Sequence, residues 1–178
     1  MKNRDSRRSK VILILGGASS GKSQAALELA GRARPKAFVA TGQALDREMT
    51  ERIQRHQVTR TKDWNTVEVP VNLAEWFRQQ GRGYRTIVLD CLTLWLSNLN
   101  GKRIRDSQVP DKVAELLRAI RKTQSRVVLV SNELGLGLVP AGRAVRRFRD
   151  RVGKVNQQIA AASDEVYFIV SGQALRLK

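Results

Sequence analysis

The sequence has one cysteine, few aromatic residues and no long apolar run, and each shortage excludes a class of protein. Cys91 stands alone among 178 residues, so neither an internal disulfide nor a zinc site built from several cysteines can form within the chain. The longest apolar runs, such as residues 11–15, are far shorter than a membrane span, and the charged N-terminus lacks the apolar segment of a signal peptide. We therefore expect a soluble, cytoplasmic protein without a membrane span.

Acidic residues are scarce as well, because 16 Asp and Glu stand against 33 Lys and Arg and the formal net charge is +17. Such a charge indicates binding to nucleic acid or a membrane surface, or else to an anionic, phosphate-rich substrate. Part of the excess lies in residues 1–10, which we predict to be a disordered basic leader. A solvated end with no specific partner is the simplest explanation of that leader.

Short apolar runs alternate with helical patterns along the rest of the chain. This alternation predicts an α/β fold with a mostly parallel sheet and helices on both faces. The length suits one domain, residues 11–178, and no low-complexity linker divides it. The predicted strands are 11–15, 37–41, 66–69, 86–90, 126–131 and 165–170, the predicted helices 23–32, 46–57, 73–80, 111–122 and 144–162, and the predicted loops 81–83 and 98–108.

Residues 16–23 read GGASSGKS and match the phosphate-binding pattern G-x-x-x-x-G-K-[ST]. The alternative is a glycine-rich turn that binds nothing, but this loop follows a predicted strand and opens a predicted helix, so its N–H groups can converge on anionic oxygens. In this pattern Lys22 reaches the β- and γ-phosphates and Ser23 ligates Mg²⁺. The residues predicted to bind ATP or GTP here are Gly16, Gly17, Ala18, Ser19, Ser20, Gly21, Lys22 and Ser23.

Asp90 closes the apolar run Thr-Ile-Val-Leu-Asp, where a phosphate-bound metal needs an acidic partner. An Asp after an apolar strand can also be a cap or turn residue. Because a phosphate loop is present, we predict that Asp90 holds Mg²⁺ through water or through Ser23.

His56 is the only histidine, and Arg52, Arg55 and Arg60 surround it in sequence. Cations disfavour the imidazolium, so the ring should tend to stay neutral and nucleophilic. In front of a nucleotide α-phosphate it could form a phosphoramidate. From the residues alone, a structural or solvated histidine remains the stronger alternative.

Several longer motifs go beyond a generic phosphate loop. In order they are GGASSGKS, FVATGQALDREMTERIQRHQVTR, DWNTVEVP with Trp64, VLDCLTLWLSNL, VVLVSNELGLGLVP and RRFRDRVGKVNQQIAAASDEVYFIVSGQALRLK. Together they closely resemble the bifunctional adenosylcobinamide kinase and adenosylcobinamide-phosphate guanylyltransferase of cobalamin biosynthesis. The resemblance covers nearly everything after the basic leader.

The resemblance implies a RecA-like P-loop NTPase fold and two reactions. In the first, ATP or GTP phosphorylates the hydroxyl of the aminopropanol arm of adenosylcobinamide. In the second, GTP transfers GMP to the resulting phosphate through a guanylylated histidine, giving adenosylcobinamide-GDP and pyrophosphate. The family's histidine falls on His56. The resemblance also implies a homo-oligomer, a trimer, for which the apolar residues 94–99 are a candidate interface.

The resemblance further implies nucleotide contacts outside the phosphate loop. Glu68 is expected to accept the N1 and N2 protons of guanine, unless it is only a surface strand residue, and Arg60 to pair with phosphate. Two departures stand out, because Ser19 occupies a position that is commonly arginine and the leader is outside the family pattern. Asn132 and Glu133 match a motif whose role is open, since they can orient substrate, act as the kinase base or cap a turn. The implied contacts are Ala40, Thr41, Gly42, Gln57, Val58, Thr59, Arg60, Glu68 and Asp90.

Two other readings stay open. In the first, the chain has only the guanylyltransferase activity. The sequence does not distinguish this from the bifunctional enzyme, because both reactions would use the same phosphate loop. In the second, the chain is a nucleic-acid-associated RecA-like ATPase, as the +17 charge suggests. Nucleic acid is the less expected partner, since only three Trp, two Tyr and four Phe are available for base stacking.

Overall fold

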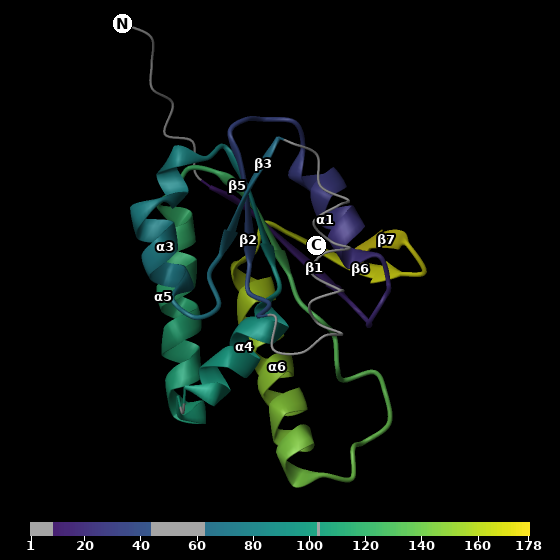
Figure 1. Cartoon of the computed structure of the whole chain (residues 1–178). Coiled ribbons are helices and arrows are strands. Elements are labelled where there is room, and N and C mark those ends of the chain that lie inside the picture. The colour runs from purple at the N-terminus through teal and green to yellow at the C-terminus, as the bar shows by residue number, and fades with distance from the viewer. Residues whose placement is uncertain (1–8, 44–62, 103) are drawn as a thin grey trace, which may run out of the picture.

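A seven-stranded sheet in the order β3-β2-β4-β5-β1-β6-β7 forms the centre of the molecule (Figure 1). The computed structural model describes residues 9–43, 63–102 and 104–178. All strand pairs are parallel except β6 with β7, which form an antiparallel hairpin. The strands are β1 Lys10–Gly16, β2 Lys36–Ala40, β3 Trp64–Glu68, β4 Thr86–Asp90, β5 Arg126–Val130, β6 Glu165–Val170 and β7 Gln173–Arg176.

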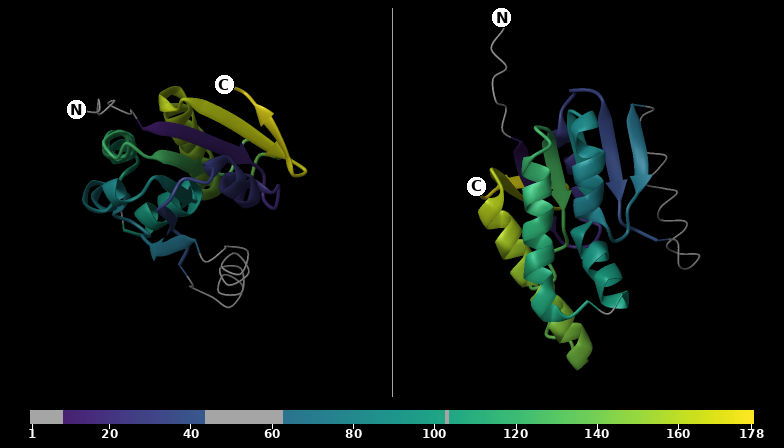
Figure 2. Two further views of the ribbon diagram at one scale, coloured as in Figure 1. Left: turned by 90° about the horizontal axis from the view of Figure 1, so that it is seen from above. Right: turned by 90° about the vertical axis from the view of Figure 1, so that its left-hand side faces the viewer.

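Helices cover both faces of the sheet, as the sequence pattern predicts. On one face α1 packs against β1, β4 and β5. On the other, α3, α5 and α6 lie side by side (Figure 2, right). The described helices are α1 Lys22–Ala30, α3 Leu73–Gln79, α4 Leu92–Gly101, α5 Val109–Arg121 and α6 Arg143–Ala162, with short 3-10 helices at Gly81–Gly83 and Asp106–Gln108.

The central strands are apolar on both faces because each face has its own core. In β1, Val11 and Leu13 belong to the cluster under α3, α5 and α6, whereas Ile12 and Ile14 belong to the cluster under α1. All four side chains are fully buried. This explains the continuous apolar run, which a strand with one solvated face would not show.

Two predicted boundaries were wrong, and one strand was missed. Residues 98–108 are not a loop, because α4 continues to Gly101 and a 3-10 helix begins at Asp106. The leader is shorter than residues 1–10, because Ser9 is buried and Lys10 begins β1. The hairpin strand β7 was not predicted, and the predicted helix 46–57 lies outside the described residues.

Three apolar residues of the segment 94–99 pack in the core of the single chain, while Leu94 is half-buried and Ser97 is exposed. Trp95, Leu96 and Leu99 are buried within the single chain, and the Trp95 indole donates a hydrogen bond to the carbonyl of Val71 at 2.8 Å. The predicted oligomer and its interface stay predictions. The most exposed large apolar residues on the described surface are Leu136, Leu138 and Val139.

None of the helices that the structure describes combines the length and the apolar character needed to cross a bilayer.

Candidate functional site

The predicted site residues that the structure describes lie at or just after the carboxyl ends of the parallel strands. Asp90 at the end of β4 is in register with Ala40 at the end of β2, which is in register with Glu68 at the end of β3. The phosphate loop follows β1, and β5 lies between β1 and β4. In open parallel sheets, ligands bind at this edge.

The phosphate loop has a backbone that only its glycines allow. A Cβ on Gly16 would lie 2.6 Å from the carbonyl oxygen of Ile169 in β6. Gly21 has φ of 97°, and a Cβ on it would lie 3.2 Å from the Cα of Gly172 in the β6–β7 turn. Gly172 donates its N–H to the Ser20 carbonyl at 2.9 Å. The unpredicted hairpin therefore supports the loop from behind. Ser19 itself takes a left-handed conformation, with φ of 55°.

Lys22 and Ser23 at the start of α1 point to different partners. The buried Lys22 ammonium contacts the carbonyl oxygen of Gly17, inside the loop where phosphate oxygens would lie. Ser23 Oγ donates a hydrogen bond to Asp90 Oδ2 at 2.7 Å, which joins the loop to the end of β4. The predicted pairing of Ser23 with Asp90 is therefore present in the structure.

The Ser23 hydroxyl and the Asp90 carboxylate fit a magnesium ion. Mg²⁺ takes oxygen ligands and is usually held by one or two protein groups together with substrate phosphates and water. The described residues contain no group of three or more His, Cys, Asp or Glu that could hold a metal alone. This is the pattern expected where the nucleotide supplies the remaining ligands, so Mg²⁺ at Ser23 and Asp90 stays a prediction with a suitable donor set.

Thr41 follows β2 and ties this edge together. Its hydroxyl donates to the carbonyl of Cys91 at 2.7 Å and accepts from the Cys91 N–H at 2.8 Å, and its carbonyl accepts from the Asn98 amide at 2.9 Å. The side chain is fully buried. Ala40 and Gly42, on either side, are half-buried, so they have surface to offer a ligand. The predicted nucleotide contacts of all three stay predictions.

The lone cysteine is structural. Burial, followed by the negative charge of Asp90, raises the pKa of the Cys91 thiol to about 11. The group therefore stays a neutral thiol near pH 7 and is a poor nucleophile. Its sulfur accepts a hydrogen bond from the N–H of Leu94 at 3.4 Å and caps α4.

The remaining predicted residues divide into one that the structure describes and five that it does not. Glu68 is exposed at the end of β3, two strands from β4, which corresponds to roughly 10 Å from Asp90. The positions of His56, Gln57, Val58, Thr59 and Arg60 lie outside the described residues.

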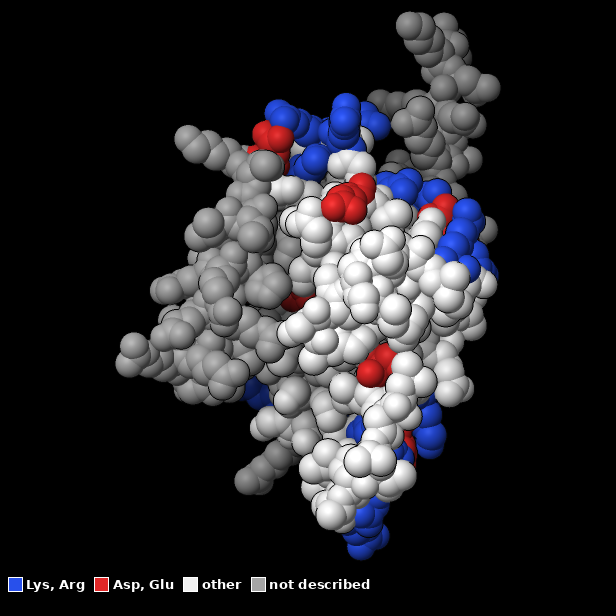
Figure 3. All heavy atoms as spheres, turned by 90° about the vertical axis from the view of Figure 1, so that its right-hand side faces the viewer, with Lys and Arg blue, Asp and Glu red and all other residues white. Residues whose placement is uncertain are grey.

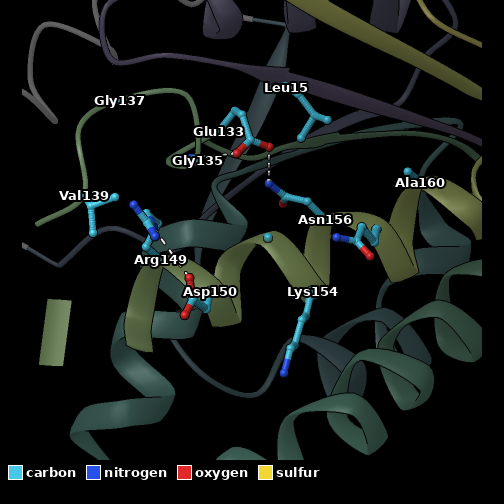
Figure 4. Close-up of a pocket in the computed structure, with 12 residues that line it drawn as sticks. Leu15, Glu133, Gly135, Gly137, Val139, Arg149, Asp150, Lys154, Asn156 and Ala160 are labelled. Atoms are coloured by element: carbon cyan, nitrogen blue, oxygen red, sulfur yellow. Dashed lines mark hydrogen bonds and ion pairs between the residues drawn. The ribbon is translucent and has the colours of Figure 1, made fainter. Parts of the chain in front are cut away.

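A cleft of about 630 Å³ opens between α6 and the segment that follows β5, and Leu15, which precedes the phosphate loop, forms part of its wall. Figure 4 shows Glu133 and Asn156 pointing toward one another across it, with Arg149, Asp150 and Lys154 along the same helix. The sequence motif around Asn132 and Glu133 indicated this segment but left its role open. Asn156 was missed, because a single asparagine in a predicted amphipathic helix gives no signal of its own.

The positive charge is unevenly spread over the face shown in Figure 3. Lys and Arg side chains gather toward the two ends of that face, and the described surface between them is mostly uncharged. A protein that tracks a nucleic-acid backbone typically offers a continuous basic stripe. This face therefore does not favour the nucleic-acid interpretation.

Solved structures with the same fold are P-loop proteins. The P4 protein of bacteriophage phi6, solved with ADP, aligns with a TM-score of 0.50 at 15% identity; the alignment covers 98% of this chain but only 56% of the P4 chain. The KaiC-like protein PH0186 of Pyrococcus horikoshii OT3 aligns with a TM-score of 0.54 at 12% identity, over 90% of this chain and 71% of that one. These likenesses confirm the predicted RecA-like P-loop fold and show nothing finer.

Sequence relatives are much closer. The protein named bifunctional adenosylcobalamin biosynthesis protein CobP of Pseudomonas aeruginosa is 43% identical over 93% of this chain and 96% of its own length. The protein named bifunctional adenosylcobalamin biosynthesis protein CobU of Escherichia coli K12 is 37% identical over 94% of this chain and 99% of its own. The family described as cobinamide kinase / cobinamide phosphate guanyltransferase matches residues 12–177. The suspected resemblance is confirmed, and the chain belongs to this family of bifunctional enzymes.

Proposed function

We propose that this enzyme carries out two successive reactions on one acceptor, first phosphorylation of adenosylcobinamide and then transfer of GMP to the new phosphate. The observation that carries the proposal is the junction of the phosphate loop with Asp90 through Ser23, in a chain that matches the family over nearly its whole length. One loop suits both reactions. It can hold the γ-phosphate during phosphoryl transfer and the departing pyrophosphate during GMP transfer.

In both reactions the loop residues bind and orient a triphosphate. The N–H groups at the start of α1 and the Lys22 ammonium neutralise phosphate charge. Ser23 and Asp90 are the groups that would hold Mg²⁺, which when bound stabilises the charge that builds on the phosphate oxygens. Because the hydrogen bond between them already sets their spacing, little reorganisation is needed when a nucleotide binds.

The second reaction is proposed to pass through His56. A neutral ring nitrogen attacks the α-phosphorus of GTP, the bond from that phosphorus to the bridging oxygen breaks, and pyrophosphate leaves with the electron pair. A phosphate oxygen of the acceptor then attacks the same phosphorus and the N–P bond breaks. The products are adenosylcobinamide-GDP and the free histidine. Gln57, Val58, Thr59 and Arg60 would contact the same nucleotide.

Glu68 is proposed to select guanine over adenine. Its carboxylate can accept the N1 and N2 protons of guanine, whereas the corresponding edge of adenine carries an acceptor. Its exposure at the end of β3 and its separation from Asp90 support a contact with the base rather than the phosphates.

The histidine step is tested by incubating the enzyme with GTP labelled at the α-phosphate. Wild-type protein should retain acid-labile, alkali-stable label, and His56→Asn, which keeps the side chain similar in size, should retain none. GTP labelled at the γ-phosphate is the control and should leave no label. An unlabelled wild type, or equal labelling of His56→Asn, would contradict the covalent mechanism.

The two activities are separated by supplying each acceptor in turn. Phosphorylation is measured with adenosylcobinamide and ATP or GTP, and GMP transfer with adenosylcobinamide phosphate and GTP. If only the second acceptor reacts, the chain is a guanylyltransferase alone.

A further inference from the structure

Backbone hydrogen bonds hold residues 131–133 against the phosphate loop. The N–H of Ser131 donates to the carbonyl of Ile14 at 2.9 Å, and that of Glu133 donates to the carbonyl of Gly16 at 3.0 Å. Between them, the N–H of Asn132 donates to Thr93 Oγ1 at 2.8 Å. Glu133 is thus placed directly beside the first residue of the loop.

This position puts the backbone of Glu133 next to the first residue of the phosphate loop. The Lys22 ammonium contacts the carbonyl of Gly17, and Gly16, the neighbour of Gly17, accepts the backbone hydrogen bond of Glu133. Strand β5, which leads into Glu133, lies between the strands that end at the loop and at Asp90. Glu133 therefore follows the strand that lies between those leading to the phosphate lysine and to the acid predicted to hold the metal.

Two contacts hold the Glu133 carboxylate in one orientation. Oε1 accepts a hydrogen bond from the N–H of Gly135 at 2.8 Å, and Oε2 accepts one from Asn156 Nδ2 at 3.4 Å. Gly135 allows this approach because it lacks a side chain, and a Cβ there would lie 2.9 Å from Oε1. A carboxylate that served only to close the turn would need Oε1 alone.

The buried Asn156 side chain has one polar atom that lowers the stability of the fold. Its side chain is buried, Nδ2 also donates to the carbonyl of Asn132 at 3.1 Å, and Oδ1 has no hydrogen-bond partner among the described residues. A buried polar atom without a partner destabilises the fold, so an apolar residue would be favoured unless the amide had another task. Holding Glu133 is that task.

The cleft in front of this carboxylate is large enough for a substrate. Its volume of about 630 Å³ falls within the range of small-molecule sites. Leu15 and Val139 give it apolar walls, and Arg149, Lys154 and Gln157 on α6 give it polar groups. Such a lining suits a bulky acceptor with polar groups at its edge.

We propose that Glu133 is the catalytic base of the phosphorylation step, that this cleft binds the acceptor alcohol, and that Asn156 positions the Glu133 carboxylate. The inference rests on the proposed function. The hydroxyl oxygen of the acceptor attacks the γ-phosphorus, its proton passes to Glu133, and the bond from the γ-phosphorus to the bridging oxygen breaks. The nucleoside diphosphate leaves with the electron pair, and Glu133 later releases the proton to water.

The GMP transfer does not need Glu133 as a base. An alcohol keeps its proton at neutral pH, whereas a phosphate monoester, with a second pKa of about 6, is already mostly ionised. Guanylylation of His56 involves no acceptor at all. Loss of the base should therefore separate the two activities.

The test compares Glu133→Gln with Glu115→Gln, a control on α5 whose carboxylate pairs with Arg78. Glu133→Gln should lower kcat for adenosylcobinamide phosphorylation by about 10²-fold or more. Its guanylylation by α-labelled GTP and its use of adenosylcobinamide phosphate should stay within about threefold of wild type. Glu115→Gln should keep both activities. Retained phosphorylation in Glu133→Gln, or equal loss of both activities, overturns the inference. A wild type that phosphorylates nothing instead overturns the proposed function.

Asn156→Asp tests the positioning role. The new carboxylate would face Glu133, and like charges disfavour one another's ionised form. The other charged groups that line this cleft are Arg149, Asp150 and Lys154. The acidic limb of the phosphorylation pH profile should move up by about one unit, with no such move for GMP transfer. Asn156→Leu should lower the kcat for phosphorylation and leave the KM for ATP unchanged. An unmoved profile in Asn156→Asp contradicts the positioning role.

Discussion

The two ends of the parallel sheet are built from similar polar residues that are used in opposite ways. At the amino end, where the strands begin, Ser9, Arg121 and Asp164 satisfy one another and the nearby backbone. At the carboxyl end, Glu133 faces an open cleft and Asn156 Oδ1 has no partner among the described residues. The first end contributes stability, whereas the second presents polar groups to a cleft.

Hydrogen bonds at the amino end join distant parts of the chain. Arg121 at the end of α5 donates to the Ser9 carbonyl at 2.6 Å and to Asp164 Oδ2 at 2.7 Å. The same Asp164 oxygen accepts the N–H of Val11 at 2.7 Å. Ser125 Oγ donates to the carbonyl of Tyr84 at 2.6 Å. These contacts hold α5, β1, β5 and the segment before β6 together.

At the carboxyl end, backbone hydrogen bonds add to the side-chain contacts of Thr41 and Glu133. The Thr41 N–H donates to the carbonyl of Asp90 at 3.1 Å, and the Glu133 N–H donates to the carbonyl of Gly16 at 3.0 Å. Among the hydrogen bonds of the described residues, the Asp90 carboxylate accepts one only from Ser23. Rigid backbone with available side chains is the arrangement that catalysis requires.

The largest expected effect is that of Asp90→Asn at the carboxyl end. The amide keeps the size of the side chain and can still accept from Ser23, but the negative charge is lost. We expect phosphorylation and GMP transfer both to fall by about 10²-fold or more, with the free energy of unfolding changed by less than about 1 kcal/mol. Assays of both activities and urea unfolding check this. If either activity stays near the wild-type level, Asp90 does not serve both reactions.

Asp164→Asn is the matched change at the amino end. It removes a charge from the hydrogen bonds with Arg121, so we expect a loss of about 1–2 kcal/mol in the free energy of unfolding. Both activities should stay near wild type at temperatures where the protein is folded. Urea unfolding, with the two assays as controls, measures it. A fall in kcat without a fall in stability would break the distinction between the two ends.

The carboxyl end was the easier of the two to predict from sequence. Its residues fall in short motifs, since Gly16–Ser23 and the acid after an apolar strand each have a chemical signature. Because parallel strands end at the same edge, those motifs had to meet, and Ser23 and Asp90 do. The network of Ser9, Arg121 and Asp164 has no comparable signal, because its members lie more than 40 residues apart and none belongs to a pattern.

The same reasoning explains the errors in the fold. Residues 98–101 of α4, with two asparagines and a glycine, have low helix propensity, so a loop was predicted. In the structure the Asn98 amide donates to the carbonyls of Thr41 and Pro70, both at 2.9 Å, while Leu96 and Leu99 are buried. Tertiary contacts therefore outweigh local preference. Strand β7 was missed because all four of its residues are exposed and it shows no buried alternation.

The smallest expected effect is that of Glu165→Gln, which sharpens the comparison by adding pH. Glu165 begins β6 at the amino end, where the Lys10 ammonium lies 2.5 Å from its carboxylate, and this contact lowers the pKa of Glu165 below its ordinary value of 4.5. A lowered pKa in the folded state contributes stability above pH 4.5, and that contribution is lost as the pH falls through the folded value.

Lys10 is partly exposed, with 42% of its side-chain surface accessible, so solvent screens the pair and we expect Glu165→Gln to cost only about 0.5–1 kcal/mol at pH 7. Thermal unfolding at pH 7, 6 and 4 should show the same cost at the first two values and a smaller one at pH 4, and neither activity should change at pH 7. Lys10→Met is the control for the partner and should reproduce this pH dependence. A cost that persists unchanged at pH 4 would mean that Glu165 acts through packing, and that charge pairing contributes nothing to this part of the amino end.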